Sequence, residues 1–291
     1  MTLQSIHNIQ EYITDELSVL YDNQESKSLS YWLLEYLLDV ERSKLHDIKN
    51  EKFPPDQKVR LNALLTELIK GKPIQYVIGQ AYFRNLVLDI DQNVLIPRPE
   101  TEMLVEHILK HAHKENKSLS GLDIGTGSGC IALSLAYESS IISMSAQDIS
   151  EPALAVAERN ARLNNIDITF FNDDILNPEF DKYNKAGYDF IVSNPPYVLE
   201  SDKDKMHKNV LEYEPSIALY VTDKNALVYY KAIIDFAQNM LKNSGILFLE
   251  IHELKGREII NLFSRRQFFK TKILKDLQNK ERFIKAVFMD D

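Results

Sequence analysis

The pentapeptide Ser193-Asn194-Pro195-Pro196-Tyr197 carries the groups in this chain that are best suited to chemistry. It follows the apolar run 188–192, and two prolines that cannot join a sheet ladder predict that a strand ends there in a stiff turn. The Asn194 side-chain carbonyl and the Pro195 backbone carbonyl can accept both hydrogens of a planar NH2 group, with the Tyr197 ring over its face. The turn is therefore a candidate receptor for an amide or an exocyclic amine, and an ordinary loop is the alternative.

A glycine-rich turn is the second candidate site. It follows a predicted strand at 122–124, precedes a predicted helix, and reads Gly125-Thr126-Gly127-Ser128-Gly129. Glycines let a ligand approach the backbone closely, and free N–H groups at a helix start favour an anionic group. The third glycine comes one residue too early for the dinucleotide spacing, so the turn alone is weak evidence for a nucleotide site.

Two acidic residues follow the next two predicted strands. Asp148 ends the strand 141–147, and in a doubly wound sheet it would lie beside the glycine turn and accept hydrogen bonds from two sugar hydroxyls. The alternative is a turn residue before the next helix. Asp174 follows the strand 168–171 and can hold an adenine amine, with Ile175 against the ring.

The elements that would position these groups fall into three segments. Residues 1–79 show helical periodicity, with Asp56 as the expected cap of a helix over 59–69, and predict a small helical domain. It is either a surface that recognises a partner or a stabilising appendage. Residues 80–100 alternate with period two on both sides of 91–93, which predicts a β-hairpin linker.

Residues 101–291 predict a third segment, an α/β domain. Glu100 or Thr101 is expected to open its first helix, and strands then alternate with helices up to the last strands at 271–274 and 283–289, which predicts a sheet with an antiparallel finish. The charged stretch 202–208 predicts a solvated loop that could act as a lid.

Composition limits the classes of function. The net charge of −9 argues against broad attraction to nucleic acid or to an anionic membrane, so we expect neither as a direct partner. The single cysteine, Cys130, allows no internal disulfide, and no long apolar span is present, which together favour a cytoplasmic protein, expected to be a monomer. We expect His107, His111 and His113 to be surface residues and expect no metal.

In their order along the chain, the glycine turn, the acid after the second strand and the Asn-Pro-Pro-Tyr turn resemble class I, Rossmann-like S-adenosylmethionine-dependent methyltransferases. The segments 95–102, 122–129, 212–215 and 281–283 narrow this resemblance to the protein-(glutamine-N5) methyltransferases of the HemK/PrmC type, over nearly the whole chain. The resemblance implies a helical amino-terminal domain, a hairpin and a mostly parallel seven-stranded sheet with an antiparallel last strand.

The same resemblance implies an activity. The family transfers a methyl group from S-adenosyl-L-methionine to the side-chain amide of the glutamine in the Gly-Gly-Gln motif of class I peptide chain release factors, which modulates translation termination. S-adenosyl-L-homocysteine would be the product, and no metal would be needed.

The resemblance also implies roles for residues. The turn 125–129 would hold the methionine moiety of the cofactor, Asp148 its ribose, and Asp174 with Ile175 its adenine, while Asn194 would lie close to both cofactor and substrate. The family often has Trp in place of Ile175, so a stacking ring is missing here. The remaining positions would bind the glutamine amide or wall its pocket, and they are Pro195, Pro196, Tyr197 and Phe83.

Two other functions compete with this interpretation. An adenine-N6 nucleic-acid methyltransferase uses the same tetrapeptide on a flipped base, but it would need a basic cleft, which the net charge disfavours. A catalytically silent binding module could keep the fold alone, and the intact Asn194 and glycine turn argue against it.

Overall fold

The computed structural model describes residues 5–115, 117–264, 266 and 269–289, and only the backbone of Lys205 and Phe269. The chain forms two units. One consists of residues 1–79 and 207–213, and the other of residues 80–206 and 214–291. The first unit ends at Gly79, where the helical segment was expected to end. Residues 207–213 also belong to this unit, which the sequence did not predict.

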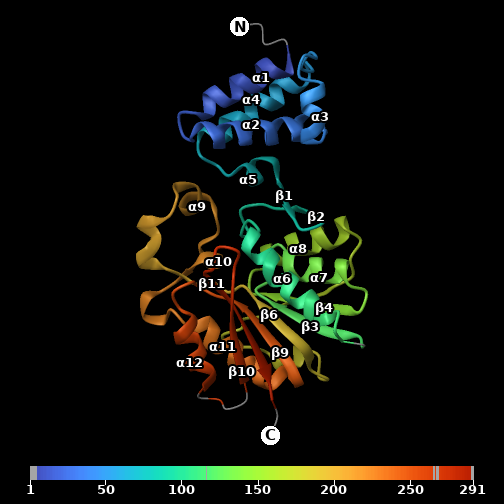
Figure 1. The fold of residues 1–291 in the computed structure, drawn as a ribbon, viewed down its shortest axis with the longest axis vertical. Coiled ribbons are helices and arrows are strands. Elements are labelled where there is room, and N and C mark those ends of the chain that lie inside the picture. Colours follow the sequence, from blue (N-terminus) through green and yellow to red (C-terminus); the bar gives the residue numbers. More distant parts are fainter. Residues whose placement is uncertain (1–4, 116, 265, 267–268, 290–291) are drawn as a thin grey trace. The chain divides into compact units, whose positions relative to one another are not determined.

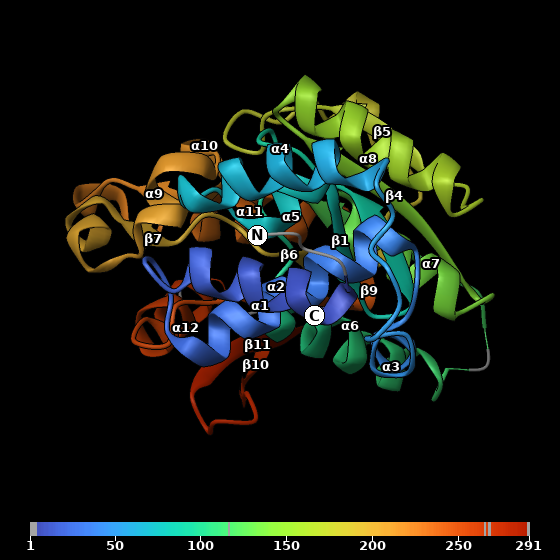
Figure 2. The same cartoon turned by 90° about the horizontal axis from the view of Figure 1, so that it is seen from above.

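The first unit is helical. Its helices α1, α2 and α4 lie side by side (Figures 1 and 2) and bury one continuous apolar cluster. The helices are α1 Ile6–Leu17, α2 Asn23–Leu38, α3 Arg42–Asp47, α4 Gln57–Ile69, α5 Ile74–Ile78 and α9 Lys208–Tyr213. Asp22 caps α2 by accepting from the Glu25 N–H at 2.8 Å. Asp56 occupies the N-cap position of α4, as expected, but its backbone is already helical and its side chain makes no capping hydrogen bond.

Helix α9 begins at Lys208, the last residue of the charged stretch 202–208 that was expected to form a loop. After a 3-10 turn over Glu200–Lys205, α9 contributes two hydrogen bonds within the helical unit. The Asn209 amide donates to the Tyr21 hydroxyl at 3.1 Å, and the Tyr213 hydroxyl donates to the Lys70 carbonyl at 3.2 Å. Within the charged stretch, residues 202–205 lie in the 3-10 turn, so this part is ordered secondary structure.

The hairpin begins the second unit. Strands β1 Gln80–Phe83 and β2 Leu86–Asp89 pair antiparallel. Their turn lies at Arg84, which has a left-handed backbone (φ 50°), and not at 91–93 as expected. The Arg84 guanidinium binds both carboxylate oxygens of Glu138, at 2.6 and 2.7 Å, and these charge-assisted bonds stabilise a turn that lacks glycine.

Among the residues that the structure describes, seven strands form the sheet of the second unit, in the order β10-β11-β9-β6-β3-β4-β5. Of these seven strands, β11 alone runs opposite to the other six, which confirms the predicted mostly parallel sheet with an antiparallel last strand. The strands are β3 Leu119–Ile124, β4 Ile142–Asp148, β5 Thr169–Asn172, β6 Tyr188–Ser193, β9 Leu241–Glu250, β10 Phe269–Lys275 and β11 Glu281–Phe288. The two-residue strands β7 Val198–Leu199 and β8 Tyr220–Val221 pair separately.

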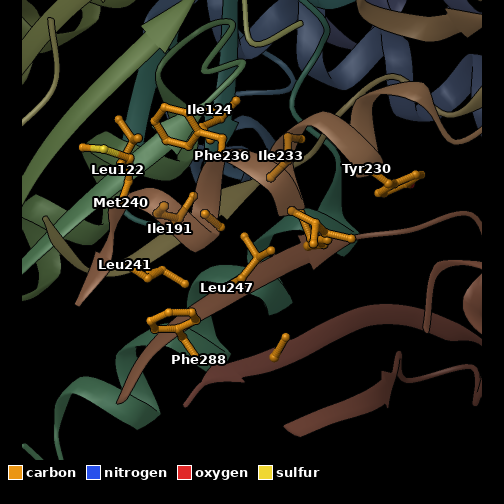
Figure 3. Packing of buried hydrophobic residues seen from close by; sticks show 14 of the residues in the cluster. Leu122, Ile124, Ile191, Tyr230, Ile233, Phe236, Met240, Leu241, Leu247 and Phe288 are labelled. Atoms are coloured by element: carbon orange, nitrogen blue, oxygen red, sulfur yellow. The ribbon is translucent and has the colours of Figure 1, made fainter. Parts of the chain in front are cut away.

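Helices cover both faces of this sheet. Helices α6 Pro99–Ala112, α7 Cys130–Glu138 and α8 Glu151–Leu163 follow one another across the sheet, and α11 Val228–Met240 packs beside α12 Gly256–Ser264. Figure 3 shows Ile233 and Phe236 of α11 near Ile191 of β6 and Leu247 of β9, within a large apolar cluster of this unit. The short helix α10 spans Ser216–Leu219. Among the described residues, no helix is long and apolar enough to cross a membrane.

The histidines of α6 correct one expectation. His107 and His111 are half-buried and pack against the rings of Phe283 and Phe248, and only His113 is exposed. Burial lowers the pKa of both packed imidazoles. No cluster of potential metal ligands occurs in the part of the chain that the structure describes.

Candidate active site

The site lies where the strand order reverses. From β3 the chain proceeds outward through β4 and β5, then returns to place β6 on the other side of β3. The Ser193 hydroxyl donates to the Ile124 carbonyl at 2.7 Å, so the carboxyl ends of β6 and β3 adjoin. A cavity opens at this switch point, which is the usual ligand position in such sheets. Among the predicted site residues, those that line it are Gly125, Thr126, Gly127, Ser128, Asp148, Asp174, Ile175, Asn194, Pro195 and Pro196.

The glycine turn provides an open cradle. The N–H groups of Gly125 and Thr126 both donate to the Gln147 carbonyl, at 2.9 and 3.0 Å, which fixes the turn on β4. Gly127 has φ +55°, and a Cβ added there would meet no atom within 4 Å. At Gly129 an added Cβ would lie 2.9 Å from Leu133 Cδ1, so this glycine serves packing and does not line the cavity.

A buried acid that the sequence interpretation did not single out holds the glycine turn from within the sheet. Asp123, in β3, accepts a hydrogen bond from the Thr126 hydroxyl at 2.7 Å. Complete burial raises the pKa of Asp123 to about 7. Its position two residues before the glycine turn was the available signal, and the apolar strand around it hid the role.

Asp148 lies beside the glycine turn, as predicted. One carboxylate oxygen accepts from the Gly127 N–H and the other from the Ser150 N–H, each at 2.9 Å. Burial raises the pKa of Asp148, and these backbone hydrogen bonds oppose the shift. Each carboxylate oxygen keeps acceptor capacity, so the group suits a ligand with two adjacent hydroxyls. An open backbone cradle next to such an acid fits S-adenosylmethionine.

The third strand end adds an apolar wall. The Asp174 carboxylate accepts from the Leu176 N–H at 2.9 Å, while Ile175 is 8% exposed and belongs to the large apolar cluster. Ile149, directly after Asp148, also lines the cavity and is 50% exposed. Sequence reasoning missed Ile149, although an apolar residue after a strand-end acid was a usable signal.

The Asn-Pro-Pro turn lines the same cavity as the glycine turn. The Asn194 amide nitrogen donates to the Thr101 hydroxyl at 3.2 Å, and that hydroxyl donates to a carboxylate oxygen of Glu250 at 2.8 Å. Thr101 was expected as a possible helix cap, and this is wrong. Helix α6 begins at Pro99, after Arg98, and the Thr101 hydroxyl points to the end of β9 instead.

Tyr197 and Phe83 do not line this cavity. The Tyr197 hydroxyl donates to the second carboxylate oxygen of Glu250 at 3.1 Å, and its ring contacts His252 edge-on. Phe83 is 1% exposed within β1. Their predicted contacts with a substrate stay predictions.

Two family models match the chain. The model of the methyltransferase small domain matches residues 99–216, which include the glycine turn, Asp148 and the Asn-Pro-Pro turn. The model of the PrmC N-terminal domain matches residues 9–79, in the helical unit. A solved structure, the delta-N METTL16 methyltransferase domain, matches with a TM-score of 0.53 at 17% identity, over 82% of this chain and 98% of its own, which shows the shared fold alone.

Curated relatives match along nearly the whole chain. The release factor glutamine methyltransferase of Flavobacterium psychrophilum is 41% identical, over 97% of this chain and 99% of its own. That of Bacteroides thetaiotaomicron is 35% identical over the same shares of each chain, 97% and 99%. With both units and the site included in this similarity, the chain belongs to the release factor glutamine methyltransferase family.

Proposed function

We propose that this enzyme transfers a methyl group from S-adenosyl-L-methionine to the side-chain amide nitrogen of the glutamine in the Gly-Gly-Gln motif of class I peptide chain release factors. In doing so it would modulate translation termination. The observation that carries the proposal is the Asn194 carboxamide, held at a cavity that the glycine turn also lines. The names of the relatives support the choice of substrate.

The proposed cofactor site follows from the cavity lining. When bound, S-adenosylmethionine supplies an electrophilic methyl group, and S-adenosylhomocysteine remains after transfer. The turn 125–129 would hold its methionine moiety, and Asp148 would accept from both ribose hydroxyls. Asp174 would bind the adenine amine, with Ile149 and Ile175 as apolar cover for the ring.

The Asn-Pro-Pro turn would activate the substrate by orienting it. An amide nitrogen is a poor nucleophile because its lone pair is delocalised into the carbonyl. Asn194 Oδ1 and the Pro195 carbonyl would accept the two amide hydrogens, aim the nitrogen at the methyl group and stabilise the positive charge that develops there. Pro196 keeps the turn stiff. The proton can leave after transfer, so the mechanism needs no obligate general base.

The test is methylation of a purified class I release factor, followed by mass spectrometry of its Gly-Gly-Gln peptide. Asn194→Ala should lower single-turnover methyl transfer by about 100- to 1,000-fold, because one positioned acceptor is lost, and should leave cofactor affinity unchanged. Asn194→Asp keeps an acceptor and should retain partial activity. Asn239→Ala, at an exposed position on α11, is the matched control. Transfer at the wild-type rate by Asn194→Ala would refute the proposed role of this turn.

A further inference from the structure

Behind Asn194 lies a short chain of buried polar groups. Thr101 and Glu250 are only 2% and 1% exposed, and they come from α6 and from the end of β9. Asn194 Nδ2 lies 3.2 Å from Thr101 Oγ1, which lies 2.8 Å from Glu250 Oε2. The three groups thus connect the cavity wall to a carboxylate in the interior.

The ionised carboxylate of Glu250 sets the direction of both hydrogen bonds in the series Asn194–Thr101–Glu250. An ionised carboxylate only accepts hydrogen bonds, so the single proton of the Thr101 hydroxyl must point to Glu250. The lone pairs of that hydroxyl then face Asn194 and require its NH2 side. The two ends of a carboxamide have nearly the same shape, so the hydrogen-bond network decides which end faces the cavity.

We propose that Thr101 and Glu250 are positioning residues, which keep Asn194 Oδ1 directed at the substrate NH2 by fixing the direction of the Thr101 proton. The inference rests on the proposed function for the identity of the substrate. Thr101 also lines the cavity and Glu250 does not, and the proposed role of both residues is exerted through Asn194.

The surroundings of Glu250 hold the carboxylate in place. The hydroxyl of Tyr197 donates to Oε1 at 3.1 Å, and the hydroxyl of Tyr230 donates to the Glu250 backbone carbonyl at 3.2 Å. Titratable and charged groups face Glu250 from every element around it, namely Glu100 on α6, Cys130 on α7, Tyr197 after β6, Tyr230 on α11 and Arg282 on β11.

A protonated Glu250 would no longer force the Thr101 proton to point away from Asn194. Burial raises the pKa of Glu250 to about 7, against the opposing hydrogen bonds from Thr101 and Tyr197. A proton on Oε2 can be donated to Thr101, whose own proton then turns to Asn194 and favours its oxygen on that side. The NH2 end of Asn194 would then face the substrate amide and could not accept from it. Methyl transfer should therefore weaken as the pH falls below about 7.

The test compares the pH profiles of kcat at saturating cofactor and release factor, over about pH 5.5 to 8.5. Wild type should lose activity on the acid side, and Glu250→Gln should lose this pH dependence whatever its absolute rate. Thr101→Val should lower kcat by about tenfold or more at every pH, with cofactor affinity unchanged, because the Asn194 amide loses its buried partner. Thr101→Ser keeps a hydroxyl, so this variant should keep both the wild-type kcat and the loss of activity at low pH.

A second readout does not depend on the reaction. In the free protein with labelled asparagine, the side-chain amide resonances of Asn194 should shift with a midpoint near pH 7 in wild type and stay unchanged in Glu250→Gln. Thermal melting confirms that each variant is folded. An acid limb that persists in Glu250→Gln, or a Thr101→Val variant with wild-type kcat, would overturn the inference. Failure of wild type to methylate a release factor would refute the proposed function alone, because the resonance titration still reports on the hydrogen-bond chain.

Discussion

At the scale of single residues, Asp148 combines a structural and a proposed binding role. Because it would accept from both ribose hydroxyls, Asp148→Ala should weaken S-adenosylmethionine binding by about tenfold or more, as measured by titration calorimetry. Asp167→Ala removes the same charge at an exposed position before β5 and serves as the control. Equal affinities of wild type and Asp148→Ala would mean that the ribose binds elsewhere.

Glu250 should make stability depend on pH. Its pKa rises from 4.5 to about 7 on folding, so between these values the folded chain binds more protons than the unfolded chain. The free energy of unfolding therefore falls as the pH rises from about 4.5 to about 7. Glu250→Gln removes this contribution.

The measurement is the free energy of unfolding in urea at about pH 5 and about pH 8. Relative to wild type, Glu250→Gln should be more stable at the higher pH than at the lower one. Asp123 behaves in the same way in both proteins and cancels in the comparison. Parallel pH dependence in the two proteins would show that Glu250 titrates alike in the folded and unfolded states.

The sequence was most informative where a residue follows a strand directly. Asp148 and Asn194 could be placed at one crevice because strand ends in a parallel sheet meet at one edge. Thr101 could not be placed, since its partner Glu250 lies 149 positions away, and only the sheet register brings α6 to the end of β9. From the sequence alone, the Thr101 hydroxyl near the expected helix start was therefore interpreted as a helix cap.

At the scale of elements, Asn160 of α8 joins the hairpin to the glycine turn. Its side chain accepts from the Asp89 N–H at 2.6 Å and donates to the carbonyls of Asp89 and Ser128, each at 2.9 Å. Asn160→Ala leaves these backbone groups without that partner and should lower the free energy of unfolding by about 2 kcal/mol or more.

The control for this prediction is Asn164→Ala. Asn164 lies one turn later, directly after α8, and its side chain donates to the Val87 carbonyl of the hairpin at 3.1 Å, so its loss should cost about 1 kcal/mol. Urea denaturation of both variants measures the difference. If the two losses are equal, Asn160 is not the main link between hairpin and glycine turn.

The hairpin also shows why some elements were predicted well and others poorly. The buried strands of the sheet are apolar runs that end at turn residues, so their type and order could be read locally. The turn at Arg84 carries none of the usual glycine signal, because Glu138 and Glu102 on distant helices stabilise its left-handed backbone. Asp91 and Asn93 form a real turn nearby, but no strand follows it.

At the scale of the whole molecule, the chain changes unit three times, because 207–213 belongs with residues 1–79. Composition and periodicity predicted the helical domain, yet they could not assign α9 to it. Its hydrogen bonds to that unit go to Tyr21 and Lys70, more than 100 residues away in sequence, so no local pattern could predict them. Any test of the helical unit must therefore separate its own contribution from that of α9.

We expect the helical unit to recognise the release factor, because none of the described residues that line the proposed cofactor cavity belongs to it. Deleting residues 1–79 should raise the KM for a whole release factor and leave kcat/KM for a short Gly-Gly-Gln peptide nearly unchanged.

The deletion also removes the partners of α9, so the control is the full chain with Asn209→Ala and Tyr213→Phe, which lacks the two hydrogen bonds of that helix. A rise in KM that the control reproduces would assign the effect to α9. Equal kinetics of the full-length and truncated enzymes on the whole release factor would show that residues 1–79 stabilise the protein without recognising its partner.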